Sequence, residues 1–102
     1  MRVMIKEPGD TPHIKKVSGM EQIREIIGGD IEEFRITDNI MILCDEIGRL
    51  KELPFCFIWG RVRFFGTCVF VGYGDGEELK DFPHNTTEDF FYEMLSKGFI
   101  PV

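Results

Sequence analysis

The chain has 102 residues, of which 43% are hydrophobic and 29% charged, with a formal net charge of −6 at pH 7. This composition indicates one globular domain, 1–102, and excludes a disordered chain and a membrane span, because no stretch approaches the roughly 20 apolar residues that cross a bilayer. The N-terminal stretch 1–8 is too short for a signal peptide, so we expect a cytoplasmic protein.

The first third of the chain predicts two strands and a helix. Apolar residues favour strands over 3–5 and 13–17. Isoleucines at helical spacing over 20–27 predict a helix with one apolar face. Ser18, with Glu21 three residues later, predicts a capping box at its start. The paired glycines that follow predict its end, because glycine adopts the left-handed C-cap conformation without a steric clash.

The middle of the chain predicts the interior of a sheet. The segment 31–36 alternates apolar and charged residues, whereas 40–44 is apolar throughout and belongs at the sheet centre, where both faces are covered. The segment 67–71 predicts a further strand. Pro54 disfavours a central strand at the start of the aromatic stretch 55–65. We predict a loop there that lays aromatic side chains over the core.

A second helix is predicted near the C-terminus, over 87–97. Asn85 or Thr86 would cap its start, and Gly98 would end it. Its apolar face consists of phenylalanine, methionine and leucine. Together these elements predict an α+β fold, with a mainly antiparallel sheet of four or five strands and two helices.

Negative charge is concentrated in the last 31 residues. Seven acids and two bases give residues 72–102 a net charge of −5, whereas residues 1–71 carry only −1. An acidic surface repels nucleic acid and favours basic clefts on other proteins. The candidate partner-binding residues are Asp75, Glu77, Glu78, Asp81, Glu88, Asp89 and Glu93.

Residues typical of catalysis or metal binding are few. The two histidines, His13 and His84, have no cysteine or carboxylate at metal-ligand spacing. The three cysteines form no Cys-x-x-Cys pair, and Cys44 and Cys68 lie in apolar runs typical of buried, reduced thiols. We therefore expect no metal site, no cofactor and no enzymatic activity.

One basic and aromatic group stands apart from this acidic background. Arg61 and Arg63 follow Trp59 closely in the aromatic stretch. An aromatic ring beside two guanidinium groups suits a small anionic ligand such as a nucleotide. A basic, aromatic pocket around these residues would favour ligand binding, whereas a continuous acidic face without a pocket would favour an inhibitor of a basic protein.

Four segments resemble a known family. These segments are 5–9, 27–32, 43–54 and 66–72, and the likeness covers roughly residues 3 to 72. The chain resembles a small family known only as a domain of unknown function, found in Gram-positive bacteria, their phages and mobile elements. The shared motifs are turns and strands, so the resemblance implies a fold and a genetic setting.

That setting suggests a function in defence. In size and charge the chain is similar to anti-CRISPR proteins that block type II RNA-guided nucleases, which hold the guide in a positively charged channel. The leading hypothesis is a non-enzymatic inhibitor whose acidic surface competes with guide RNA or target DNA on such a basic host nuclease. The alternatives are a protein that binds a small ligand or nucleotide signal, and a structural accessory protein. We expect no direct contact with nucleic acid or membranes.

Overall fold

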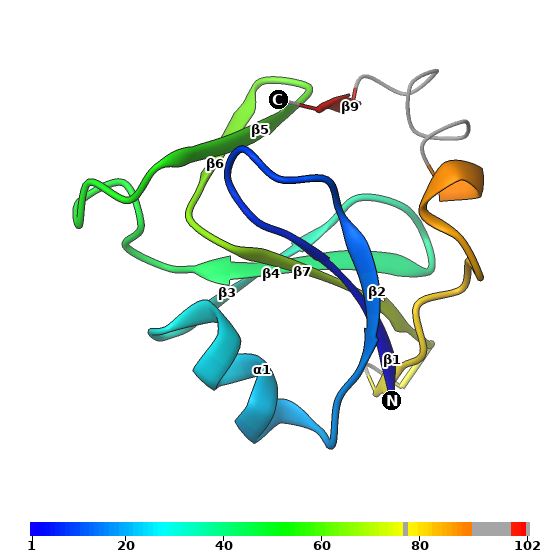
Figure 1. Ribbon diagram of the computed structural model, residues 1–102. Coiled ribbons are helices and arrows are strands. Elements are labelled where there is room, and N and C mark those ends of the chain that lie inside the picture. The colour runs from blue at the N-terminus through cyan, green and yellow to red at the C-terminus, as the bar shows by residue number, and fades with distance from the viewer. Residues whose placement is uncertain (77, 91–98, 102) are drawn as a thin grey trace.

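The computed structural model describes residues 1–76, 78–90 and 99–101, and its centre is an antiparallel sheet (Figure 1). The sheet order is β2-β1-β7-β4-β3, with β8 paired to the end of β7. A second sheet has the order β6-β5-β9. The strands are β1 (Arg2–Lys6), β2 (His13–Lys16), β3 (Ile31–Arg35), β4 (Ile40–Asp45), β5 (Phe55–Trp59), β6 (Val62–Phe65), β7 (Cys68–Tyr73), β8 (Leu79–Lys80) and β9 (Phe99–Pro101). The α+β prediction is confirmed, with six strands in the main sheet.

The two innermost strands, β4 and β7, are buried along almost their whole length. They pair directly, with Ile42 opposite Phe70 and Leu43 opposite Val69. Successive side chains of a strand point to opposite faces, so an apolar run fills the core on both sides of the sheet. The prediction that the apolar segment 40–44 lies in the sheet interior, with both faces covered, is therefore confirmed.

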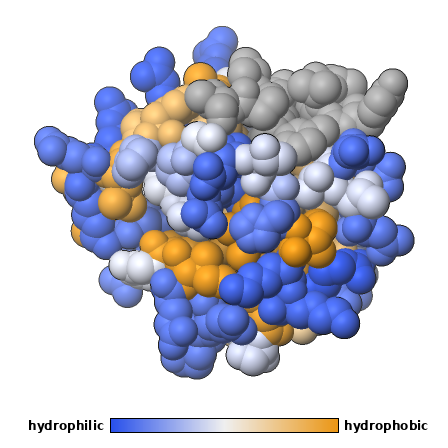
Figure 2. All heavy atoms as spheres, in the orientation of Figure 1, coloured by the Kyte–Doolittle hydropathy of each residue, from blue (hydrophilic) through white to orange (hydrophobic). Residues whose placement is uncertain are grey.

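Helix α1 (Met20–Ile27) covers one face of the sheet. Ile23 and Ile27 pack there against a layer that includes Val3, Leu43 and Val71. Figure 2 shows hydrophobic atoms across the region between α1 and the sheet, framed by hydrophilic residues. Among the described residues, this amphipathic helix therefore shields that face of the sheet from water.

The sequence predicted the C-terminal end of α1 correctly but not its N-terminal cap. Gly28 is the left-handed C-cap, with φ 84° and its N–H donating to Arg24 O, as expected. The predicted capping box is wrong: Gly19 is the N-cap and no side chain caps it. The backbone N–H of Ser18 instead donates to the Gln22 side chain at 2.8 Å, one turn into the helix.

An aromatic hairpin of β5 and β6 covers the opposite face, which corrects the predicted loop over 55–65. Phe57 and Phe64 are buried and stack at a centroid distance of 4.7 Å. Phe57 also stacks on Phe70 of the main sheet at 5.5 Å. The pairing shifts in register between Phe55 and Phe57. The aromatic side chains lie over the core as expected, but a hairpin carries them.

The C-terminal helix is described only at its start. Residues 87–90 are helical, and the Thr86 hydroxyl accepts the Asp89 N–H at 3.2 Å, as a capping residue should. Phe90 is buried and meets Phe70 edge-on at 5.2 Å. The rest of the helix predicted over 87–97 lies outside the described residues.

Replacing Phe70 or Ile42 by alanine tests this core. Both side chains are fully buried at facing positions of β7 and β4, so each change leaves a cavity that its neighbours fill only in part. We expect each variant to lose about 2–5 kcal/mol of unfolding free energy in denaturant titrations. The exposed control Val62→Ala should change it by less than about 0.5 kcal/mol. A Phe70→Ala loss as small as the control's would contradict the described core.

Candidate functional site

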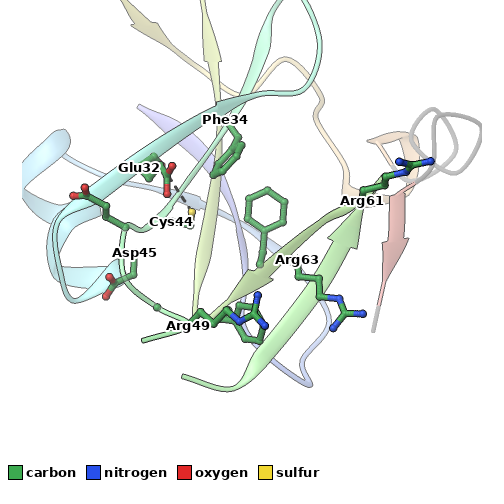
Figure 3. A pocket seen from close by; sticks show the side chains of 11 residues that line it. Glu32, Phe34, Cys44, Asp45, Arg49, Arg61 and Arg63 are labelled. Carbon is green, nitrogen blue, oxygen red and sulfur yellow. Dashed lines mark hydrogen bonds between the residues drawn. The ribbon is translucent and has the colours of Figure 1, made fainter. Parts of the chain in front are cut away.

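A cavity of about 480 Å³ opens where the aromatic hairpin and the edge of the main sheet separate (Figure 3). We call it the arginine pocket. It is built by β3, β4, the loop after β4, and the hairpin. Its lining residues are Glu32, Phe34, Cys44, Asp45, Glu46, Gly48, Arg49, Arg61, Arg63, Phe64 and Phe65. Three stretches that are distant in sequence, 32–34, 44–49 and 61–65, therefore contribute to one site.

Three arginines form the basic wall of the arginine pocket, and in Figure 3 the side chains of Arg61 and Arg63 extend outward from the hairpin, away from Phe34. Arg61 and Arg63 come from the turn and second strand of the hairpin, and Arg49 comes from the loop after β4. All three residues are exposed, and none forms an ion pair within the described chain. Guanidinium groups bind phosphate and carboxylate through paired N–H donors, so this wall is suited to an anion.

The opposite wall carries carboxylates from the main sheet. In Figure 3 Glu32 and Asp45 lie on the β3–β4 side, across from Arg61 and Arg63. Glu32 pairs across the two strands with Cys44, and the exposed Glu46 follows Asp45. A second cavity of about 420 Å³, next to α1, shares Glu32 and Glu46 with the arginine pocket. The pocket is therefore polarised, basic on one side and acidic on the other.

Asp45 is held by the loop and is not a free carboxylate. Its Oδ2 accepts from Lys51 Nζ at 2.7 Å, and its Oδ1 accepts the Ile47 N–H at 2.9 Å. Burial favours the neutral acid, but these two donors outweigh it and hold the pKa of Asp45 below its usual value. Lys51 thus neutralises Asp45, and Glu32 and Glu46 are the other carboxylates that line the arginine pocket.

The loop after β4 is tightly ordered around this ion pair. The Lys51 N–H donates to Ile47 O, and the Leu53 N–H donates to Gly48 O, both at 3.0 Å. A Cβ at Gly48 would lie 2.9 Å from the backbone O of Phe65, so only glycine lets the loop approach the hairpin this closely. These contacts fix the backbone that carries Arg49 to the pocket.

Aromatic rings and a thiol form the floor of the arginine pocket. Phe34 of β3 meets Phe64 of the hairpin edge-on, with ring centroids 5.1 Å apart. Burial, followed by the nearby charges of Glu32 and Asp45, raises the pKa of Cys44 to about 12. The thiol is therefore protonated at neutral pH and is not a nucleophile. The floor therefore offers an apolar surface.

A second buried polar cluster lies deeper, between the two sheets. Lys6 is 1% exposed, and its ammonium donates to Glu7 O at 2.7 Å. The Cys56 thiol donates to Lys6 O at 3.4 Å. A hydrogen bond from Cys68 and the Lys6 charge lower the pKa of Cys56, while that bond and burial raise the pKa of Cys68. Both thiols are fully buried, so we assign them a packing role.

The structure separates the residues that the sequence grouped as one ligand site. Arg61 and Arg63 line the arginine pocket, but Trp59 does not and packs against the aromatic core instead. Arg49, Glu32 and Phe34 were missed. No local signal could have found them, because they reach the site from two other segments, β3 and the loop after β4.

The acidic candidates lie elsewhere in the fold. Asp75 and Glu78 are exposed in the connection between β7 and β8, and Glu88 and Asp89 are exposed at the start of the last helix. Asp81 has a structural contact, since its Oδ1 accepts the Arg2 N–H at 2.8 Å. Glu77 and Glu93 are outside the described residues.

Two kinds of feature are absent from the described ranges. No group of three or more histidine, cysteine or acidic side chains is arranged to hold a metal ion there. No helix among the same residues is long and apolar enough to cross a bilayer.

Comparison with known proteins identifies a family. A family model described as "Domain of unknown function (DUF3846)" matches residues 1–96, which is nearly the whole chain. No curated protein and no solved structure matches. The comparisons therefore agree with the sequence resemblance to a family without an assigned activity, and they add no ligand or partner.

The Asp45→Asn substitution tests whether the ion pair organises the loop. Removing the charge leaves Lys51 without its partner, and we expect a loss of about 1–3 kcal/mol in unfolding free energy. This is less than for a fully buried pair because the Lys51 side chain is 38% exposed.

The effect of Asp45→Asn should depend on pH. The folded pKa of Asp45 lies below its unfolded value, so its stabilisation is present above about pH 4 and is lost as the pH falls through the folded pKa. Denaturant titrations at pH 7 and at lower pH should show the gap between variant and wild type closing. A gap that does not change with pH would contradict the role of the charge.

Proposed function

Because the chain belongs to the DUF3846 family, whose function is unknown, we propose a function from the geometry of the arginine pocket. The protein is a non-enzymatic, cytoplasmic binding protein, and the pocket holds a small phosphorylated ligand of the nucleotide class. The observation that carries this proposal is that one cavity is lined by an aromatic floor and by three arginines that form no ion pair within the described chain.

The charge distribution supports a small ligand over a polymer. The chain as a whole carries −6, so a long polyanion approaching it meets net repulsion. A single phosphate group at the arginine pocket is instead attracted to the nearby charges of Arg49, Arg61 and Arg63. Those arginines gain charge-assisted hydrogen bonds that no described side chain supplies. The cavity volume is within the usual range for small-molecule sites.

Isothermal titration calorimetry with nucleoside monophosphates tests the proposal. We expect saturable binding to wild-type protein and at least tenfold weaker binding to the Arg61→Ala/Arg63→Ala double variant, because hydrogen bonds to charged groups contribute about 1.5–3 kcal/mol each. The matched control is Lys15→Ala/Lys16→Ala on β2, which removes the same charge far from the pocket and should bind like wild type. Equal affinity in both double variants, or no binding to wild type, would refute the proposal.

A second candidate function is inhibition of a type II RNA-guided nuclease by an acidic surface, as the charge distribution of the sequence suggested. The observation that favours it is the exposure of four acidic residues, Asp75, Glu78, Glu88 and Asp89. Of these, Glu78 pairs with the exposed Lys80 at 3.6 Å. Such groups steer association with a basic channel and weaken in effect as salt rises.

Charge reversal tests this second candidate. In a DNA cleavage assay with a purified type II RNA-guided nuclease, we expect wild-type protein to inhibit and Asp75→Lys/Glu78→Lys to inhibit at least tenfold less well at low salt, because it replaces attraction by repulsion. The control Glu21→Lys/Glu25→Lys places the same charge change on α1. Failure of the wild type to inhibit, or equal inhibition by both variants, would refute it.

A further inference from the structure

We propose that the nucleotide bound in the arginine pocket carries a guanine base, and that Glu32 reads it. This inference rests on the proposed function and specifies the ligand of the same site. The arginine pocket has an unusual lining for an anion site. Such a site ordinarily excludes carboxylates, but here a wall of carboxylates lies opposite the arginines.

The two walls fix the direction of the ligand. Phosphate is attracted to Arg49, Arg61 and Arg63 and repelled by Glu32 and Glu46, so it binds on the hairpin side. The other end of the ligand then meets the β3–β4 side, where an ionised carboxylate only accepts hydrogen bonds. A ligand that satisfies both walls has a phosphate at one end and N–H or O–H donors at the other.

Glu32 is the carboxylate best placed to meet those donors. It lies on β3 two residues before Phe34, so both side chains are on the same face of the strand, the face that carries the pocket. Figure 3 shows Glu32 beside Cys44 on the acidic side, near the Phe34 ring. No described side chain forms an ion pair with Glu32, unlike Asp45, which Lys51 holds.

Among the common bases, guanine alone offers a carboxylate two adjacent donors. Its ring N–H and its exocyclic amino group point the same way and form two parallel bonds to one carboxylate. Adenine and cytosine offer an amino group beside an acceptor, and uracil offers one N–H between two carbonyls, so each brings an acceptor against Glu32. The half-buried Phe34 supplies an apolar face on which the base rests.

The experiment compares ligands that differ in one part. Wild-type protein is titrated in a calorimeter with GMP, AMP, ribose 5-phosphate and inorganic phosphate. We expect GMP to bind at least tenfold more tightly than AMP, and AMP to bind no more tightly than ribose 5-phosphate. A site built to hydrogen-bond a donor rejects the analogue that lacks it, because its acceptors are then left unpaired.

The substitution Glu32→Gln identifies the residue. Glutamine turns an N–H₂ group toward guanine's donors and can pair with adenine, so GMP should weaken at least tenfold while AMP does not weaken. Ribose 5-phosphate should be unaffected. The matched control is Glu33→Gln, on the opposite face of β3 and outside the arginine pocket, which should leave the GMP preference intact. Both positions are exposed, so both variants should unfold at the wild-type temperature.

The outcomes separate this inference from the proposed function. If GMP and AMP bind equally and both depend on Arg61 and Arg63, the guanine inference is overturned and the nucleotide pocket stands. If GMP is preferred but Glu32→Gln leaves that preference unchanged, the role of Glu32 is overturned. If no nucleotide binds, or the arginines are irrelevant, both proposals fail together.

Discussion

The pairing of β4 with β7 is the constraint on which the rest of the structure depends. These strands are apolar on both faces, with Ile42 opposite Phe70 and Leu43 opposite Val69, so the sheet is unstable in water until both faces are covered. A chain of 102 residues has few residues outside the sheet to pack against its two faces. It uses one short helix on one side, and on the other an aromatic hairpin together with the start of a last helix.

The arginine pocket is a consequence of this arrangement. The hairpin stacks on the sheet through Phe57 and Phe64 and then diverges from its β3 edge. The arginine pocket opens where they diverge, and the contact between Phe34 and Phe64 forms its floor. The charge of each wall comes from the side chains of the elements that form it. Strand β3 and the end of β4 supply the acidic residues, and the hairpin and Arg49 supply the basic ones. The Asp45–Lys51 ion pair stabilises the loop between the two walls.

Sequence patterns predicted the elements better than the site. Periodicity located α1 and the inner strands, because both depend on one-dimensional spacing. It missed the β5–β6 hairpin, since Pro54 disfavours a strand and the apolar residues that follow it over 55–59 do not alternate with polar ones. It also misassigned the cap of α1. Arg61 and Arg63 could be recognised as candidates because they are charged residues within an aromatic stretch of sequence. Their partners Glu32, Phe34 and Arg49 could not, because only the strand order brings them together, and Trp59 faces the core instead.

We propose that the molecule binds its ligand at the arginine pocket, where the hairpin diverges from the main sheet. The most direct measurement is a two-dimensional amide NMR titration of the labelled protein with GMP. We expect the shifted amides to cluster in three segments, 32–34, 48–49 and 61–65, and the connection between β7 and β8 to be unaffected. Shifts confined to residues 75–89, or no saturable shifts at millimolar GMP, would contradict it.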